Sequence, residues 1–344
     1  MGELQSSIEV KLVAQVTEER IASGRGTLLD PAQVPHLAVG TLVTCNLSTA
    51  LKLYREAFGF ECVEYAPGRA LARDRRAKYL MQNGGRDFFL LDLTEVRSVD
   101  HPQAVHNHWG LSVGSVDEVT RIHEALTAKQ SEYGLKQIRT PAKMHGSFGF
   151  YFVDGDDNWW EIECRAGIFH EELFAKGDWD DPDRESFPHA APRSLEIAPI
   201  ASVVVGPEAF LTHGTAAIRD THKPRGLYEK VLGLRFVRHN RAAGLMAGAG
   251  DFAVVNLRQM AVQDQGQENR FVILLDNEAA LEAMQARATE TAEEFGVLSI
   301  SDIERTQFGG RSFLMRTRDH IWFEISTRSR QSYLDLFDKE TAAH

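Results

Sequence analysis

A glutamate in a strongly apolar stretch is the first residue of this sequence that could do chemistry. Glu161 lies near the end of the run Phe150–Glu163, where an apolar alternation breaks at Asp-Gly-Asp-Asp-Asn and then resumes. This pattern predicts a strand, a tight turn and a second strand. A carboxylate in the middle of such a strand carries a large desolvation cost unless a cation or hydrogen-bond donors meet it. Glu161 therefore either faces a cation or lies with Glu163 on the solvated face of an amphipathic strand.

Two histidines are the other candidates for chemistry. His213 lies in the apolar stretch 210–214, and His108 lies close to His101 and His106 along the chain. Neutral imidazole is a common metal ligand. Taken alone, however, His213 also fits a hydrogen-bonded histidine of the core, and His108 also fits a polar loop. Neither residue alone predicts a metal site, because the sequence does not show which residues are its neighbours in space.

The composition fits a globular protein with more than one domain. The 344 residues are 43% hydrophobic, which is enough for two domains with separate cores. The formal net charge is −11, and the acidic residues are not gathered in a tail. Nucleic acids and anionic membranes bind clusters of Lys and Arg, so we expect neither as a partner.

The cysteines and the apolar segments indicate where the protein works. Cys45, Cys62 and Cys164 are odd in number and lack CxxC spacing, which is typical of buried thiols in a reducing compartment. No segment approaches the about 18 continuous apolar residues of a membrane helix, and the N-terminus lacks the apolar core of a signal peptide. The sequence therefore predicts a cytoplasmic protein.

The chain contains an internal repeat. The stretch Leu53–Phe60 recurs as 227–234, with an offset of 174 residues between the two tyrosines, and each copy ends in a glycine followed by an apolar strand. A glycine at that place is a typical helix stop. A second match aligns Trp159 with Trp322 and Glu161 with Glu324, at an offset of 163 residues. Two repeats that share a start and an end imply duplicated domains.

Each duplicated half divides again into two similar units. The first unit reads as strand, helix (48–58) and strands near 60–66, 77–82 and 87–93, and the second has its helix near 117–130. The four predicted βαβββ units cover residues 36–93, 108–165, 211–259 and 270–326. We predict an N-terminal extension (1–34), a first domain (35–168), a linker rich in Asp and Pro (169–209), a second domain (210–327) and a closing amphipathic helix (328–344).

These units carry motifs of a known family. Asn46-Leu47 leads into a Leu-Tyr-x4-Gly-Phe helix, and the second unit ends in Phe-Tyr-Phe-x-Asp-Gly-Asp-Asp-Asn-Trp-Trp-Glu. The chain thereby resembles the vicinal oxygen chelate superfamily over most of 36–326. That group includes glyoxalase I, type I extradiol ring-cleaving dioxygenases and metal-free antibiotic-binding proteins. The resemblance implies an α+β fold in which four βαβββ units form two incomplete β-barrel domains around a divalent metal.

The resemblance also implies a set of ligand positions. The family places a His in the first strand of one unit, seven residues before the Asp or Asn that precedes the helix; in the third unit this is His213, but in the first it is Val39. It places another His and a Glu in the first and last strands of the paired unit, which are His108 and Glu161 in the second unit.

In the fourth unit the glutamate is present as Glu324, but the histidine position falls on Arg270 or Phe271. A full ligand set therefore exists only if the second unit pairs with the third, which joins His108, Glu161 and His213. If each half instead folds on itself, His36 is a competing ligand. Two histidines and one carboxylate suit Fe(II) best and also accept Mn, Ni or Zn.

Two further residues match catalytic positions of the extradiol dioxygenases. Tyr151 lies ten residues before Glu161, and His145 lies six residues before Tyr151. The resemblance implies that Tyr151 hydrogen-bonds a substrate oxygen and that His145 acts as acid and base. The His-to-Tyr spacing is shorter than in the family, and Gly155 stands where the family usually has Pro. Alternatively, Tyr151 only packs the barrel wall and His145 lies in an exposed loop.

We therefore predict a metal-dependent enzyme, first of all an extradiol-type dioxygenase that cleaves a small aromatic diol with O2. One alternative is a glyoxalase-like isomerase or lyase that works through a metal-bound enediolate. That chemistry often uses a fourth acidic ligand, and Asn256 stands near where this carboxylate is expected, which disfavours it. Another alternative is a metal-free protein that binds a flat small molecule. The sequence leaves open whether the protein forms a homo-oligomer.

Overall fold

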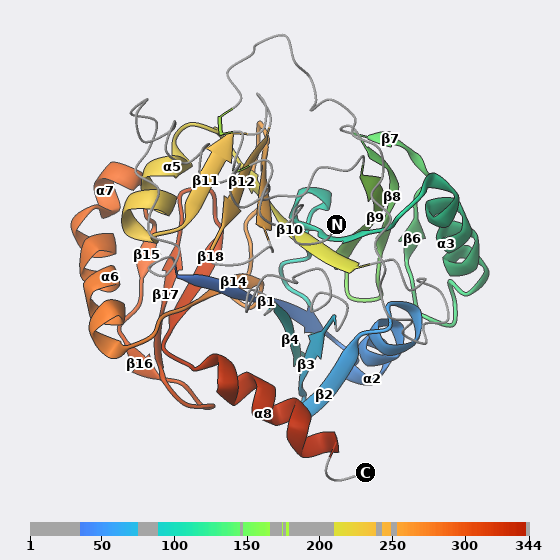
Figure 1. The fold of residues 1–344 in the computed structure, drawn as a ribbon, viewed down its shortest axis with the longest axis horizontal. Coiled ribbons are helices and arrows are strands. Elements are labelled where there is room, and N and C mark those ends of the chain that lie inside the picture. The colour runs from blue at the N-terminus through green and yellow to red at the C-terminus, as the bar shows by residue number, and fades with distance from the viewer. Residues whose placement is uncertain are drawn as a thin grey trace, which may run out of the picture.

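The computed structural model describes residues 35–74, 89–144, 147–165, 174, 177–178, 210–238, 243–248 and 253–341. Within them the protein is a mixed α+β fold built on two open, nine-stranded sheets that are not closed barrels (Figure 1). The predicted class and the βαβββ units are thereby confirmed.

Sheet A combines the first and fourth units. Its central strands are β1 (His36–Thr44) and β14 (Arg270–Leu274), which are antiparallel with an irregularity between Leu37 and Val39. One wing is formed by β4 (Leu90–Glu95), β3 (Arg69–Arg73) and β2 (Glu61–Ala66), and the other by β18 (Trp322–Ser326), β17 (Arg311–Arg316), β15 (Ser299–Ile300) and β16 (Glu304–Arg305).

Sheet B repeats this plan with the second and third units. Its central strands are β10 (Phe210–Ile218) and β5 (Trp109–Ser112), again antiparallel with an irregularity, here between Leu211 and His213. One wing is formed by β13 (Ala253–Arg258), β12 (Ala243–Ala247) and β11 (Arg235–Arg238), and the other by β9 (Trp159–Arg165), β8 (Ser147–Val153), β6 (Gln137–Ile138) and β7 (Ala142–Met144).

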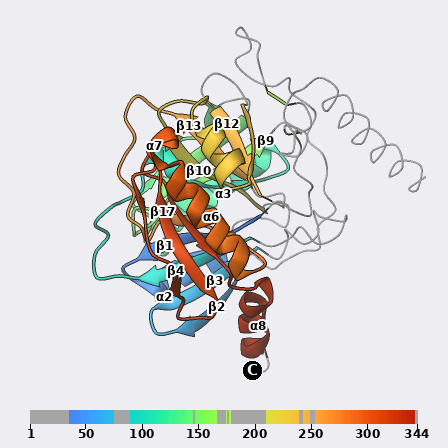
Figure 2. The ribbon, with the colours of Figure 1, turned by 90° about the vertical axis from the view of Figure 1, so that its left-hand side faces the viewer.

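The helices begin at capping residues that the sequence supplies. The side chains of Asn46, Ser115 and Asn277 each accept a hydrogen bond from the backbone three residues on, which satisfies a free N–H of the first turn. Figure 2 shows α6 lying along β17. The helices and helical turns are α2 (Leu47–Lys52), η2 (Leu53–Ala57), η4 (Val105–Asn107), α3 (Val116–Ala128), α5 (Pro224–Gly226), η5 (Leu227–Val231), α6 (Glu278–Glu290), α7 (Ala292–Phe295) and α8 (Arg330–Thr341).

The sheets do not follow the order of the chain. Each sheet takes one unit from residues 35–168 and one from 210–327, so hydrogen bonds join units across the predicted division into two consecutive domains. The boundaries of those domains, of the extension 1–34 and of the linker 169–209 stay predictions. The strand expected near 77–82 lies outside the described residues; the described strand β3 is formed by Arg69–Arg73.

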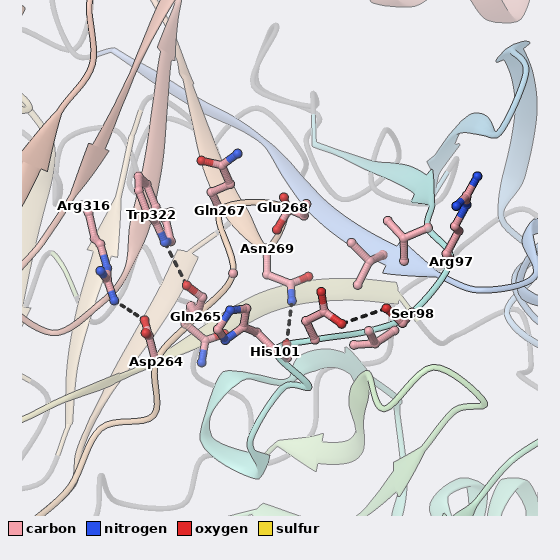
Figure 3. A pocket seen from close by; sticks show the side chains of 15 residues that line it. Arg97, Ser98, His101, Asp264, Gln265, Gln267, Glu268, Asn269, Arg316 and Trp322 are labelled. Atoms are coloured by element: carbon pink, nitrogen blue, oxygen red, sulfur yellow. Dashed lines mark hydrogen bonds and ion pairs between the residues drawn. The ribbon is translucent and has the colours of Figure 1, made fainter.

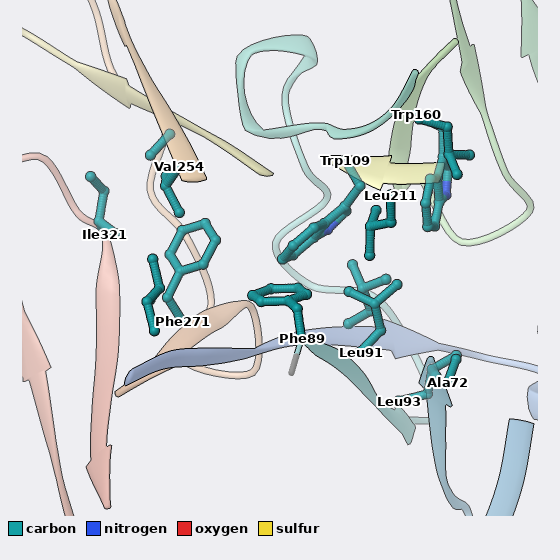
Figure 4. Packing of buried hydrophobic residues seen from close by; sticks show 14 of the residues in the cluster. Ala72, Phe89, Leu91, Leu93, Trp109, Trp160, Leu211, Val254, Phe271 and Ile321 are labelled. Carbon is teal, nitrogen blue, oxygen red and sulfur yellow. The ribbon is translucent and has the colours of Figure 1, made fainter. Parts of the chain in front are cut away.

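The two sheets share a hydrophobic core in which large rings fill space left by glycines. A Cβ at Gly40 of β1 would lie 1.9 Å from the Trp109 ring of β5, and one at Gly214 of β10 would lie 3.1 Å from the Phe271 ring of β14. Figure 4 shows Trp109, Phe271 and Phe89 meeting between strands of the two sheets. These glycines and rings occupy corresponding places in the two copies, so the repeat also shapes the contact between the sheets.

Helix α8 covers one face of sheet A. Tyr333 and Phe337 are buried against Val39 of β1, Leu71 of β3 and Val272 of β14. This cluster fills the space next to the position where the first unit has valine instead of histidine. None of the helices in the described part of the chain is long and apolar enough to cross a membrane.

Candidate metal centre

Strand pairing lines up four residues on one face of sheet B. Tyr151 of β8 pairs with Glu161 of β9, Glu161 pairs with Gly110 of β5, and Gly110 pairs with His213 of β10. Directly paired residues point to the same face of a sheet. Glu161 therefore faces His213, although the two residues come from different halves of the chain.

His108, Glu161 and His213 form a compact buried cluster. The Oε2 atom of Glu161 lies 3.1 Å from Nε2 of His108 and 3.2 Å from Nε2 of His213. One ligand atom from each residue lies within 4.8 Å of the others, and the three residues are only 2%, 4% and 1% exposed. The structure thus brings together the three residues that the sequence predicted as metal ligands.

Neighbouring groups orient both imidazole rings. Nδ1 of His108 lies 2.6 Å from the backbone oxygen of Val105. A carbonyl can only accept, so Nδ1 carries the proton and Nε2 faces Glu161. Nδ1 of His213 is 2.9 Å from the hydroxyl of Thr212. Such hydrogen bonds on the far nitrogen typically hold metal-binding histidines in place.

The electrostatics of the cluster favour an ionised glutamate. Burial alone would raise the pKa of Glu161, but the charges and hydrogen bonds of His108 and His213 outweigh it and hold this pKa well below its usual range. Burial and the nearby charge of Glu161 raise the pKa of Tyr151, whose ring centroid lies 5.0 Å from that of His108. The phenol therefore stays protonated and remains a hydrogen-bond donor.

The donor set fits a divalent transition metal. Imidazole nitrogens and carboxylate oxygens bind such ions at about 2.1 Å, which places neighbouring donors around one ion about 3 Å apart. The two short separations in this cluster, 3.1 and 3.2 Å, match that spacing. His108, Glu161 and His213 could hold a metal ion with little movement of their side chains.

Gly110 makes room for this arrangement, and sequence reasoning missed it. A Cβ on Gly110 would lie 2.0 Å from Cε1 and 2.4 Å from Nε2 of His213. Only glycine lets the His213 ring lie flat over β5 and reach Glu161. The pairing of Gly110 with His213 becomes visible only once β5 and β10 are known to be neighbours.

The position of a fourth ligand is occupied by valine. Gly110, two residues after His108, pairs with Glu161; Thr215, two residues after His213, pairs with Val255 of β13. Val255 therefore corresponds to Glu161. The sequence placed Asn256 near this position. In the structure Asn256 is the next residue of the strand and faces the other way, and its Oδ1 accepts a hydrogen bond of 2.9 Å from Tyr228.

The same face of sheet B has a polar half and an apolar half. Beyond Val255 this face carries mainly apolar side chains from β11, β12 and β13, and Phe174 packs on them. Arg235 of β11 also lies on this face, with its guanidinium 4.5 Å from the centre of the Phe174 ring. The members of this apolar half are Val237, Ala243, Leu245, Ala247, Val255 and Leu257. A ligand next to the cluster would meet carboxylates and a phenol on one side and hydrocarbon on the other.

A second carboxylate on the polar half was also underrated by sequence reasoning. Glu163 is 3% exposed, and its Oε1 lies 3.8 Å from Nδ1 of His213. The alternation of β9 puts Glu163 on the same face as Glu161. The solvated strand face considered for both glutamates is therefore wrong, since both are buried.

The remaining predicted residues lie elsewhere. His145 falls outside the described residues. His36 lies in β1 of sheet A, where it pairs with Leu274, so the structure does not bring it to His108 and Glu161.

The corresponding place in sheet A contains an ion pair. Arg270 occupies the position of His108, because Val272 pairs with Glu324 as Gly110 pairs with Glu161. The Arg270 guanidinium lies 2.6 Å from Oε2 of Glu324, and Asp92 lies nearby at the position of Val255. A fixed cation thus neutralises Glu324, and Arg270 and Val39 occupy the two histidine positions, so no imidazole stands at either of them.

Comparison with known proteins gives one family match. Residues 33–162 match the family model described as the Glyoxalase/Bleomycin resistance protein/Dioxygenase superfamily. None of the curated proteins compared matches the chain.

Solved structures share the fold across most of the chain. Glyoxalase I from Zea mays is 14% identical, with a TM-score of 0.55 over 89% of this chain and 96% of that one. A mutant of the same enzyme is 13% identical, with a TM-score of 0.56 over 88% and 95%. A protein from Bacillus subtilis subsp. subtilis str. 168 is 13% identical, with a TM-score of 0.51 over 85% of each chain. At these identities the likeness shows the fold alone.

Proposed function

Because residues 33–162 match the model of the Glyoxalase/Bleomycin resistance protein/Dioxygenase superfamily, we propose that the chain is a metal-dependent enzyme acting on a small molecule. His108, Glu161 and His213 hold a divalent ion, with Fe(II) as the first choice and Mn, Ni or Zn as alternatives. The reaction that the site supports best is extradiol-type cleavage of a small aromatic diol with O2.

The observation that carries this proposal is the valine at the fourth ligand position. Two histidines and one carboxylate leave several positions on an ion open, and Val255 adds no donor. A substrate with two neighbouring oxygens and a molecule of O2 both need such positions. Bound Fe(II) would supply the Lewis acidity and the electrons for this chemistry.

The chain's own residues orient the substrate in this proposal. The protonated Tyr151 donates a hydrogen bond to a substrate oxygen. The apolar half of the sheet, which includes Val237 and Val255, receives the hydrocarbon edge of the ring. His145 moves a proton during ring opening, as its place in the sequence motif implies.

A second candidate reaction is isomerisation through an enediolate. Glu163 favours it, because a second buried carboxylate on the same face could take a proton from a carbon next to a carbonyl group. This reaction consumes no oxygen and exchanges a substrate hydrogen with solvent. Oxygen consumption and hydrogen exchange with solvent therefore distinguish the two candidate reactions.

Anaerobic purification, iron loading and oxygen uptake with a panel of catechols test the proposal. Extradiol cleavage predicts uptake of one O2 per catechol and a yellow ring-opened product, both lost in Glu161→Ala. Tyr151→Phe, which removes only the hydroxyl, should lower kcat by about 10² or more. Iron-loaded protein that takes up no oxygen but exchanges deuterium into an α-hydroxy ketone would establish the isomerase instead. Protein that retains no metal would reject both.

A further inference from the structure

The cross-strand row that carries the metal cluster continues to an arginine. Arg139 follows β6 directly, and its backbone N–H donates to the carbonyl of Tyr151 at 2.8 Å, which extends the pairing of β6 with β8 by one residue. Tyr151 pairs in turn with Glu161. Because directly paired residues point to the same face of a sheet, Arg139 lies on the face of Glu161 and next to Tyr151.

A contact with Trp159 agrees with this placement. Trp159 precedes Glu161 by two residues in β9, so the alternation of the strand puts both on the same face. The Arg139 guanidinium lies 4.7 Å from the centre of the Trp159 ring. Such a contact holds a cation over a ring without neutralising its charge. That charge acts against the rise in the pKa of Tyr151, as expected for neighbouring groups.

The internal repeat provides a comparison for Arg139 and Tyr151. In sheet A the backbone N–H of Ser301 donates to the carbonyl of Leu314 at 2.9 Å, and Leu314 pairs with Glu324. Ser301 and Leu314 therefore stand where sheet B has Arg139 and Tyr151. The sheet without a complete ligand set thus also lacks this guanidinium and this phenol.

The two sheets also differ in the charge balance beside the corresponding tryptophans. In sheet A the guanidinium of Arg316 lies 5.5 Å from the centre of the Trp322 ring. Figure 3 shows this arginine with its ion-pair partner Asp264. Arg139 in sheet B is exposed and forms no ion pair with a carboxylate of the described residues. A ligand can therefore reach its guanidinium and meet an uncompensated positive charge.

A second arginine ends the same row on the opposite side. The pairing runs from His213 through two alanines to Arg235. Arg139 is separated from Glu161 by Tyr151 alone. Arg139 is thus the closer of the two cations to the cluster along the row.

The spacing of the row fits a ligand that reaches from the cluster to Arg139. Neighbouring strands lie about 4.8 Å apart, so the backbones of Arg139 and Glu161 are separated by about 10 Å. A substrate oxygen held by Tyr151 lies between them, and a ring substituent that points away from the metal extends towards Arg139. The carboxylates of Glu161 and Glu163 balance a divalent ion, which leaves one positive charge on this side of the cluster.

We propose that the substrate of this site carries a carboxylate, which Arg139 binds through two parallel N–H···O hydrogen bonds. The inference rests on the proposed function, because it takes the two diol oxygens to lie at the metal and Tyr151 to hold one of them. It narrows the substrate to an aromatic diol with a short acidic side chain. Arg139 thereby selects the substrate and sets the direction in which its ring lies.

Calorimetric titration of the full chain loaded with Zn(II) tests this inference. Zinc has no redox chemistry, so binding is measured without turnover. The probes are 3,4-dihydroxyphenylacetate and 4-ethylcatechol, which has a side chain of similar length without the carboxylate. We expect the acid to bind at least about tenfold more tightly, with a smaller difference at high salt. Equal affinities would overturn the inference and leave the metal site and the proposed reaction standing.

Variants assign the preference to one residue. Arg139→Met should weaken binding of the acid about tenfold and leave that of 4-ethylcatechol unchanged, whereas Arg139→Lys should retain part of the preference. Arg305→Met, at an exposed position of β16 in sheet A, is the matched control and should change neither. Thermal unfolding checks that each variant is folded. A preference lost in Arg235→Met and retained in Arg139→Met would overturn the assignment.

A failure of the proposed function gives a different result. If neither diol binds the zinc-loaded protein, diol cleavage is rejected, and hydroxypyruvate and hydroxyacetone replace the diols as probes. These two compounds share an α-hydroxy ketone and differ in a carboxylate against a methyl group. A preference for hydroxypyruvate that Arg139→Met removes would support recognition of a carboxylate by Arg139. No binding, or a preference that the variant retains, would overturn it.

Discussion

His213 and Gly110 depend on each other at the scale of single residues. The imidazole of His213 occupies the space that any side chain at 110 would fill. The other sheet contains the opposite combination, with Val39 and Val272 side by side at the corresponding positions. A histidine at this position reaches the glutamate only if the paired residue is glycine. A valine does not extend that far, so the residue paired with it can carry a side chain.

The first prediction concerns this fit. Gly110→Ala places a methyl group 2.0 Å from Cε1 of His213, so the ring must turn away from Glu161. We expect metal affinity to fall at least tenfold while the fold is retained, measured by metal titration and circular dichroism. Val272→Ala, at the matching position of sheet A, is the control and should leave metal affinity unchanged. Unchanged affinity in Gly110→Ala would show that His213 does not act as a ligand.

The second prediction distinguishes His213 from His36, the two rival candidates for the ligand that joins His108 and Glu161. His213→Ala removes a proposed ligand directly, so metal affinity should drop about 100-fold or more. His36→Ala should retain the metal, because His36 pairs with Leu274 in the other sheet. Metal analysis after dialysis measures both. Loss of metal from His36→Ala alone would reject the cluster in sheet B.

Among the elements, the turn between β8 and β9 sets the register of Tyr151 against Glu161. Asp154 organises this turn, since its carboxylate accepts hydrogen bonds from the backbone of Asp156 and Asn158, from the Asn158 side chain and from Trp160 Nε1. Burial nevertheless raises the pKa of Asp154 to about 6. The turn is therefore held by a carboxyl group that favours its protonated form more than usual.

A third prediction follows for the pH dependence of stability. A raised pKa in the folded state means that the contribution of Asp154 is fully present below pH 3.8 and is lost as the pH rises through about 6. The loss amounts to at most about 3 kcal/mol. Urea unfolding from pH 4 to 7.5 should show a difference between wild type and Asp154→Ala that shrinks with pH. A difference that stays constant across this pH range would contradict the assignment.

Helix α8 covers the face of sheet A that corresponds to the metal-site face of sheet B. This face of sheet A has no complete set of ligands. Phe337 of α8 is 2% exposed, and the Arg73 guanidinium lies 4.2 Å from the centre of its ring. As a fourth prediction, Phe337→Ala should lower the free energy of unfolding by about 3 kcal/mol. Metal binding should not change, because α8 packs on the other sheet. A simultaneous loss of metal would show that the two sheets are coupled through this helix.

The whole molecule is organised by pairing between non-adjacent quarters of the chain. Each sheet needs strands from both halves, and the clustered residues come from the second and third units. The consecutive halves therefore cannot each build a complete sheet with a complete cluster. This arrangement explains why the repeat in the sequence does not correspond to two self-contained sites.

A fifth prediction tests this organisation with separate fragments. Residues 35–209 alone contain His108 and Glu161 but not His213, so they should bind metal at least about 100-fold more weakly than the intact chain. Co-expression with 210–344 should restore binding, because the second fragment completes both sheets. Size-exclusion chromatography with metal analysis measures the result. Full affinity in the first fragment alone would contradict the shared site.

The local elements were predictable because their causes are local. The helices expected at 48–58 and 117–130 were confirmed, since Asn46 and Ser115 cap them and apolar periodicity sets their length. The βαβββ units followed from the repeat. The face of Asn256 was misjudged, because a shift of one residue in strand register reverses the face. The burial of Glu163 could not be predicted, because it depends on which segments pack over that face of the sheet.

By itself the sequence determined the four units, their strands and helices, and which side chains could serve as ligands, since hydrogen bonding within a segment and side-chain alternation are written in neighbouring residues. Only the tertiary structure decided that His213 faces Glu161 over Gly110 and that Arg270 neutralises Glu324. Those facts depend on which units share a sheet, and that choice is made by packing between residues more than 50 positions apart in the chain.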